Sequence, residues 1–259
     1  MLNQFLSWMF STWLVFPILV IVLLGLSEFG WRVGLARSRT KPEKTRDFGS
    51  VPAAVLTLLG LLLGFTFAMA VSRHDTRREL VVQEANSIST TARRARLLPE
   101  PQAANVARLL REYVALRIEA HRETQFSQRF AALRKSSADL HERLWNEAVA
   151  AAAKQPTPIT ASFIVSLNET IDYEATRIAA KRNHVPGAVW LLLLCVASCG
   201  LWLTGWQAGI ARGHPFLARF LFPILIAVVI ALITDIDTPR GGLIALDDRP
   251  LLELNDSLK

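Results

Sequence analysis

The stretch from Leu58 to Ser89, LLGLLLGFTFAMAVSRHDTRRELVVQEANSIS, begins as an apolar run and continues into a dense series of charged residues. It contains no proline, and both of its glycines lie in the apolar half. A pattern of this kind predicts one long helix that begins in the hydrocarbon core of a membrane and continues into water. The fold therefore has to combine a membrane part with a part outside the membrane.

Composition also indicates a membrane protein. Of 259 residues, 51% are hydrophobic, the mean hydropathy is +0.29 and the formal net charge is +7, which is unusual for a soluble domain. Three runs carry no charged side chain and are long enough to cross a core of about 30 Å as a helix. They are Leu2 to Ser27, Phe48 to Ser72 and Asn183 to Ala211.

A fourth apolar run extends from Pro215 to Thr234 and carries Arg219 near its start. A long cationic side chain in that place can reach the lipid headgroups. We therefore expect four transmembrane helices. The first is expected to be retained, because it lacks the charged start and the cleavage site of a signal peptide.

The polar residues between the second and third spans are too many for a loop and follow the helical period. We expect the second span to continue as far as Pro99 and Pro101, and further helices over residues 105–123 and 127–154 and from near Ile159 towards the third span. The predicted fold class is an all-α integral membrane protein with four transmembrane helices and a helical extramembrane section between helices 2 and 3.

This interpretation divides the chain into four parts. Residues 1–72 hold transmembrane helices 1 and 2 with a basic connecting loop, and residues 73–185 form the helical extramembrane section. Residues 186–234 hold transmembrane helices 3 and 4, and residues 235–259 form an acidic C-terminal tail. In the tail we expect one small strand around Leu243 to Leu246.

The second span offers two candidate faces. Gly60 and Gly64 lie four residues apart and form a small-residue face that favours close packing of helices. Thr57, Leu61 and Phe65 lie on a slightly rotated face. If several copies of the helix surrounded an axis, they would form a mostly apolar constriction, and so a pore lining. The alternative for these three residues is ordinary packing or lipid contact.

Charged residues follow at the end of the second span and of the fourth. Arg73 and Arg77 are candidates for attracting anions, because symmetry would multiply each charge around a ring. Their alternative role is to anchor the helix at the membrane interface. Asp235 and Asp237 also have two interpretations. They lie at a pore mouth or bind a cation, or else they are simply the solvated end of a helix.

No motif favours a catalytic or metal site. The five histidines form no HExxH pattern, and no Gly-rich phosphate loop or nucleophile elbow occurs. Cys195 and Cys199, in the third span, are best explained as small packing residues. We expect neither an enzyme nor a bound cofactor. The arginines gather near the spans, which favours lipid headgroups over nucleic acid as partners.

Three segments of the chain resemble a widespread bacterial bestrophin-like family. They are LLGLLLGFTFAMAVSR from Leu58, LNETIDYEATRIAAKRNHVPGAVWLLLL from Leu167 and DIDTPRGGLIALDDRPLLEL from Asp235. The similarity covers roughly residues 45–259 and includes the order of two spans, a helical section, two more spans and a tail. Bestrophins are pentameric ion channels, mostly anion-selective, so the resemblance implies a channel of that kind.

The resemblance also implies a neck made by three apolar residues of the second span at four-residue spacing. Placing the phenylalanine of its LGF motif on Phe65 puts the other two positions on Leu61 and Thr57. Thr57 departs from the expected apolar type. The contiguous acidic cluster that binds calcium in animal bestrophins has no clear match, because the aspartates of this tail are spaced differently.

Two functional hypotheses follow. The first is a homo-oligomeric ion channel that conducts anions such as chloride across the bacterial inner membrane, and the resemblance implies that it is a pentamer. The second is a membrane-anchored helical sensor or scaffold that conducts nothing. Membrane lipids, small inorganic ions and further copies of the chain are the expected partners.

The orientation in the membrane has conflicting signals. The resemblance puts both termini and residues 73–185 in the cytoplasm. By contrast, the basic loop between the first two spans, set against an N-terminus without Lys or Arg, favours that loop facing inward. Arginines and lysines that flank the spans on the other side nearly balance this count. We adopt the orientation that the resemblance implies.

Overall fold

The computed structural model describes residues 12–40, 49–123, 127–212, 216–238, 244 and 246–259. Throughout these ranges the regular structure is helical, and no strand occurs in them. The chain divides into two compact units. We call Met1–Ser72 with His184–Ala245 the membrane unit, and Arg73–Asn183 with Leu246–Lys259 the helical unit.

The membrane unit contains the apolar helices. In the described ranges four helices are long and apolar enough to cross a membrane, which confirms the predicted all-α membrane fold. The first residues of the first expected span, 2–11, lie outside the described part. The elements of this unit are α2 (Thr12–Thr40), the first part of α3 (Val51–Ala95), α7 (Gly187–Ile210), the short π-helix η2 (Leu217–Leu221) and α8 (Phe222–Asp237).

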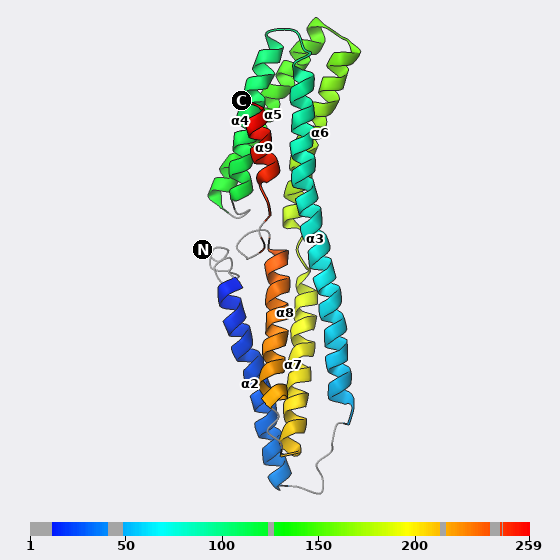
Figure 1. The fold of residues 1–259 in the computed structure, drawn as a ribbon, viewed down its shortest axis with the longest axis vertical. Helices are drawn as coiled ribbons and strands as arrows, with labels where there is room; N and C mark the ends of the chain where they lie inside the picture. Colours follow the sequence, from blue (N-terminus) through cyan, green and yellow to red (C-terminus); the bar gives the residue numbers. More distant parts are fainter. Residues whose placement is uncertain (1–11, 41–48, 124–126, 213–215, 239–243, 245) are drawn as a thin grey trace. The chain divides into compact units, whose positions relative to one another are not determined.

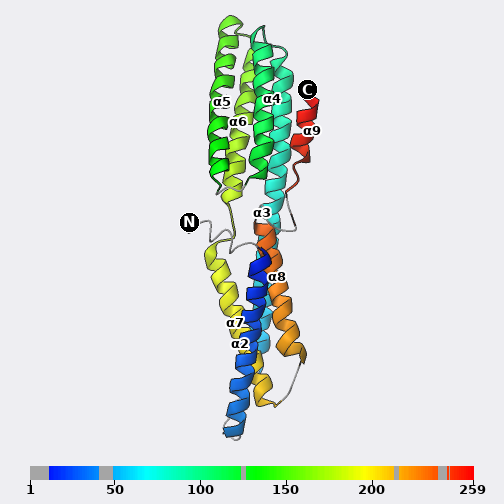
Figure 2. The same cartoon turned by 90° about the vertical axis from the view of Figure 1, so that its left-hand side faces the viewer.

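Helix α2 packs along α7 and α8 (Figures 1 and 2). Side chains from all four helices form one apolar cluster, which Leu23, Leu59, Leu201 and Ile233 represent. Each of these four is at most 2% exposed. The charge-free runs that predicted the spans thus supply the core of the membrane unit as well as its outer surface.

Close approach of α2 and α7 depends on four glycines. A Cβ atom built on any of them would lie 2.2–2.3 Å from a backbone oxygen of the other helix, closer than real Cβ atoms come. No side chain can fit there, so only glycine lets the two backbones touch. The four are Gly30, Gly34, Gly205 and Gly209, which form the G-x-x-x-G segments GWRVG and GWQAG.

These segments were not predicted from the sequence, in which the small-residue face was expected at Gly60 and Gly64. A Cβ atom at either of those two positions meets no other atom within 4 Å in the described chain. Their expected role in helix packing therefore has no counterpart within one copy and stays a prediction about contacts between copies.

Arg219, in η2, has a protein partner. Its guanidinium forms an ion pair with Glu28 of α2, and its central carbon lies 3.9 Å from the centroid of the Trp31 ring. Only 12% of the Arg219 side chain is exposed. Pairing with a carboxylate and stacking on an aromatic face both lower the cost of a charge in an apolar segment. The pair joins the start of the fourth span to the first.

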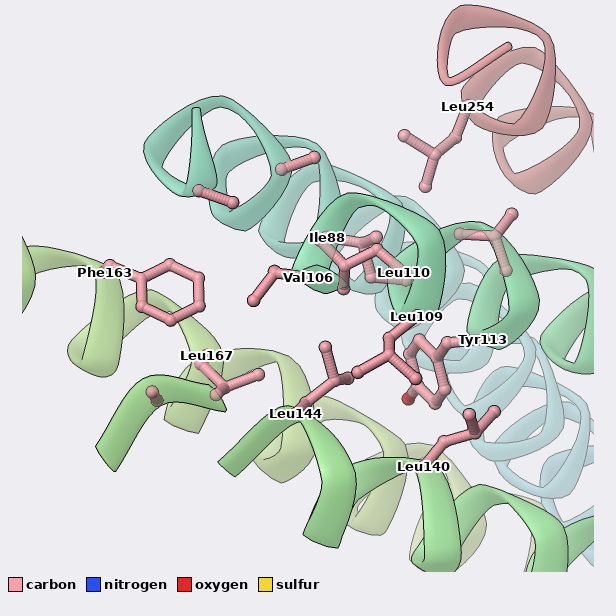
Figure 3. Close-up of a cluster of buried hydrophobic side chains, with 14 of the residues drawn as sticks. Ile88, Val106, Leu109, Leu110, Tyr113, Leu140, Leu144, Phe163, Leu167 and Leu254 are labelled. Carbon is pink, nitrogen blue, oxygen red and sulfur yellow. The ribbon is translucent and has the colours of Figure 1, made fainter. Parts of the chain in front are cut away.

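The helical unit is built from five elements. They are the second part of α3, α4 (Gln102–Arg122), α5 (Gln128–Lys154), α6 (Pro158–Arg182) and α9 (Arg249–Ser257). The first four agree with the predicted helices to within a few residues at each end. Their apolar stripes meet in one cluster, which Figure 3 shows around Ile88, Leu109, Tyr113, Leu144 and Phe163.

Local signals explain where these helices begin. At α5, the Ser127 hydroxyl oxygen accepts a hydrogen bond from the Phe130 N–H at 2.9 Å. At α6, the Thr157 hydroxyl accepts from the Thr160 N–H at 3.3 Å, and Pro158 occupies the first turn. Both are standard N-caps, which satisfy an amide that has no partner within its helix.

Helix α9 was not expected from the sequence. It packs on α4, and Leu251 and Leu254 are buried in the core of the helical unit, with Leu254 labelled in Figure 3. The strand expected around Leu243 to Leu246 falls partly on residues outside the described ranges, and Ile244 and Leu246 belong to no strand. The two leucines are three positions apart, so they share one face of a helix, which was the signal for α9.

We expect Gly205→Ala to destabilise the membrane unit, because the added Cβ would meet the backbone of α2. The cost should be roughly 1–3 kcal/mol, as for other overpacked interfaces. Thermal unfolding of the purified protein in detergent would measure it. Gly25→Ala is the matched control, since a Cβ at Gly25 meets nothing within 4 Å. Equal unfolding temperatures for the two variants would contradict the close contact.

Candidate pore face and buried ion-pair network

Within the membrane unit α3 has a buried face and an exposed face. Leu59, Leu63 and Ala70 are at most 8% exposed and belong to the apolar cluster. By contrast, Leu61 and Phe65 are 55% and 65% exposed. The apolar side chains of the predicted pore lining thus do not belong to the core of one chain. These two exposed side chains are therefore available to contact lipid, another copy of the chain or the water of a pore.

Thr57, the third predicted pore-lining residue, is also exposed. Its hydroxyl donates a hydrogen bond to the carbonyl oxygen of Ala53 at 2.9 Å. The polar hydrogen is therefore used within the helix, and the methyl group supplies the remaining surface of the side chain. This makes Thr57 a less polar member of its face than its residue type suggests.

Arg77, predicted to attract ions, is buried at 3% exposure. Its Nε donates to the carbonyl oxygen of Ala180 at 3.2 Å and its Nη2 to that of Asn183 at 2.7 Å. These carbonyls end α6, where a cation is favoured by the helix dipole. Arg77 thus has a structural role as a cap. Arg73 is partly exposed, and attraction of ions by either arginine stays a prediction.

Asp235 and Asp237 are only 3% and 6% exposed, so the interpretation as a solvated helix end is wrong for both. The carboxylate oxygens of Asp237 accept from the Val185 N–H at 3.0 and 3.2 Å, and His184 Nδ1 lies 3.1 Å from the Asp237 carbonyl oxygen. Asp235 accepts from the Ile244 N–H at 3.1 Å. The aspartates therefore fix the backbone around the start of α7 and the start of the tail.

No metal site is evident in the described ranges, where no three His, Cys, Asp or Glu side chains come close enough to hold an ion. Two of the tail aspartates, which lack the spacing of the calcium-binding cluster, form ion pairs instead. Asp247 pairs with Arg249 and Asp248 with Arg122.

The helical unit contains a buried network of two carboxylates and two guanidinium groups. Glu84, which is fully buried, accepts from Arg117 Nε at 2.7 Å on one oxygen and from Arg177 on the other. Arg117 Nη1 also lies 3.1 Å from an oxygen of Glu174. Two negative and two positive charges balance within the core, which is the condition for burying them at a tolerable cost.

Glu174 has further partners. Its Oε2 accepts from the Tyr113 hydroxyl at 3.0 Å and from the Ser137 hydroxyl, and His141 Nε2 lies 3.2 Å away. Burial by itself would raise the pKa of Glu174, but the nearby His141 ring and the charge of Arg117 outweigh it and lower the pKa to about 2. Burial also raises the pKa of Tyr113, whose hydroxyl stays protonated as a donor.

His121 connects this network to the tail. Arg177 Nη2 lies 2.8 Å from His121 Nδ1, and a guanidinium can only donate, so Nδ1 is the acceptor. The ring proton is then on Nε2, which faces the carbonyl oxygen of Leu246 at 3.4 Å. The bond from Arg177 thus fixes the tautomer of the ring.

This network was not predicted from the sequence, although the sequence contains a signal for it. Charged residues occupy positions of the helical period where apolar ones are expected. Glu84 lies between Val81 and Ile88, and Glu174 lies seven positions after Leu167 on the same helical face. Charged side chains on a core-facing stripe indicate buried pairing.

We expect Glu174→Gln to lower the free energy of unfolding by roughly 3 kcal/mol at neutral pH, because it leaves a buried arginine and histidine without that charge. The contribution of Glu174 is fully present above about pH 4.5 and is lost as the pH falls towards 2. Unfolding temperatures measured across this range should therefore fall less steeply with decreasing pH in the variant.

Glu142→Gln is the control, since Glu142 is exposed on the same helix as Ser137 and His141. If both variants lost the same stability, the network would not be a determinant of the fold.

Comparisons with known proteins show which family and which solved structures this chain resembles. The profile of the Bestrophin-like domain family matches residues 19–251. A solved bacterial bestrophin homolog from Klebsiella pneumoniae is similar at a TM-score of 0.66 and 16% identity, over 92% of this chain and 95% of that one. A second solved structure, of a membrane protein, has a TM-score of 0.69 at 16% identity, over 92% and 97% of the two chains. No curated protein matches the chain.

Proposed function

The chain belongs to the bestrophin-like family, and from this premise we propose that several copies of it form an ion channel whose pore is lined by α3. As a multi-pass membrane protein with the fold of a bestrophin homolog, it has the architecture that such a channel requires. We further propose that the channel is a homopentamer and conducts anions such as chloride. It lies in the bacterial inner membrane, with the helical unit on the cytoplasmic side.

The single observation that supports the pore most directly is the exposed face of α3. Two large apolar side chains, Leu61 and Phe65, lie one helical turn apart and are more than half exposed, with Thr57 one turn earlier. Gly64 beside them leaves space for a neighbouring helix. In a ring of copies this face would form a narrow apolar constriction, which controls ion passage by how readily water fills it.

The anion preference rests on charge rather than on the neck. An apolar ring does not distinguish the sign of an ion, whereas a net charge of +7 per copy raises the local concentration of anions around an oligomer. The family resemblance points to the same sign.

We expect Phe65→Ala to raise the conductance several-fold in planar bilayers, because it widens the constriction. Current would be recorded from purified protein under a salt gradient, and the reversal potential would give the charge of the permeant ion. Phe29→Ala is the matched control, since Phe29 of α2 is 58% exposed but lies outside the proposed pore face. A change of equal size in both variants would argue against a pore at Phe65.

The rival function, a non-conducting sensor or scaffold, has less support. Small-molecule sensors use pockets of about 300–1,000 Å³, whereas the cavity beside Phe130 in the helical unit holds about 80 Å³. The rival still makes a distinct prediction about assembly.

Native mass spectrometry in detergent should yield a pentamer for the wild-type protein. We expect Gly64→Ala to weaken that assembly while leaving the fold of each copy intact, because no atom of the same chain lies within 4 Å of the added Cβ. A stable dimer or monomer without current would favour the sensor or scaffold.

A further inference from the structure

A small cavity lies in the helical unit, between the first two turns of α5 and the last turns of α6. It holds about 80 Å³, several times the roughly 10–15 Å³ that one water needs by the same measure, so a tetrahedral oxyanion fits. The lining residues are Phe130, Ala131, Arg134, Ile178, Lys181 and Arg182.

The lining is strongly basic. Three of its six side chains are cations, Arg134 from α5 and Lys181 and Arg182 from α6, and none is acidic. In the described part of the chain, Arg134 and Arg182 form no ion pair with a carboxylate. Three positive charges around one hollow repel each other and attract an anion.

The dipole of α6 explains only part of this arrangement. Lys181 and Arg182 occupy the last turn of α6, where cations are favoured on any helix. Arg134, however, is near the start of α5, far from the C-terminal end of that helix. Helix electrostatics therefore do not favour the third cation, and an anion held between α5 and α6 would offset the repulsion among the three charges.

The floor of the cavity is apolar and well packed. Phe130 is 5% exposed and packs with Ala120, Leu133 and Ile178 in a small cluster of its own. Lys181 Nζ lies 5.0 Å from the centroid of the Phe130 ring and 3.4 Å from the carbonyl oxygen of Ala120. These contacts hold the ammonium group in place before any ligand binds, which lowers the entropic cost of binding.

We propose that this cavity binds a phosphate-type oxyanion, supplied either as free phosphate or as the phosphodiester of an anionic lipid. Two guanidinium groups provide the planar donor pairs that match phosphate oxygens, and the lysine adds a fixed charge. In the sequence, Arg182 precedes the start of α7 at Gly187 by five residues, which is the reason to test a lipid headgroup as one source of the phosphate. The site is independent of whether the protein conducts ions.

Binding of inorganic phosphate to the full chain in detergent would be measured by ³¹P NMR line broadening. The test compares the wild type with the double variant Arg134→Gln, Arg182→Gln. The control is Arg96→Gln, Arg111→Gln, which removes the same charge from two arginines that are exposed, as Arg134 and Arg182 are, but lie outside the cavity. We expect saturable binding that is about tenfold weaker or more in the cavity variant and unchanged in the control.

A second experiment tests whether the phosphate comes from a lipid. Protein in nanodiscs that contain both phosphatidylglycerol and phosphatidylcholine would be released and analysed by native mass spectrometry. Retention of phosphatidylglycerol by the wild type and the control, but not by the cavity variant, identifies a lipid phosphodiester. Saturable binding of free phosphate without lipid retention identifies the free anion.

Two outcomes would overturn the proposal. One is equal loss of binding in the cavity variant and the charge-matched control, which would mean general electrostatic attraction. The other is absence of both phosphate binding and lipid retention in folded wild-type protein. Neither outcome depends on a current, so failure of this site and failure of the channel proposal are distinguishable.

Discussion

In the hydrocarbon core of a membrane every backbone amide and carbonyl must find its partner within the protein, and α3 meets this constraint by remaining one helix from Val51 to Ala95. The division between the two units falls inside it, between Ser72 and Arg73. The chain therefore passes from an apolar to a polar composition without releasing a backbone group. The same helix contributes Leu59 to the core of the membrane unit and Glu84 and Ile88 to that of the helical unit.

The membrane unit uses backbone contact where a soluble protein would rely on apolar side chains. Lipid tails solvate leucine as well as other leucines do, so apolar burial provides little drive for helices to associate. Contact of the α2 and α7 backbones at glycines such as Gly205, together with the Glu28–Arg219 pair, supplies interactions that lipid cannot replace. With α2, α7 and α8 packed in this way, the exposed side chains of α3 at Leu61 and Phe65 remain available for contacts beyond the single chain.

The helical unit solves a different problem. Its buried ion pairs gain little net stability over apolar residues of the same size, because desolvation offsets much of the attraction. Their geometry, however, is satisfied by few arrangements. Glu84 from α3, Arg117 from α4 and Arg177 from α6 must meet together, and His121 adds the backbone ahead of α9. We regard the network as fixing which helices pack and in which register, more than as a source of stability.

The sequence by itself determined the class of the fold and the helices. Long charge-free runs cannot remain in water, and the helical period with prolines and caps fixes where the helices of the polar section begin and end. The same reading located the family through the segment around Phe65. Only the tertiary structure decided the contacts between helices. It placed the close backbone approach at Gly30 and Gly205 rather than at Gly60. It also buried Arg77 as a cap of α6 and Asp237 as the acceptor for the Val185 N–H. Such contacts join residues far apart in the chain, and local periodicity contains no information about which faces will meet.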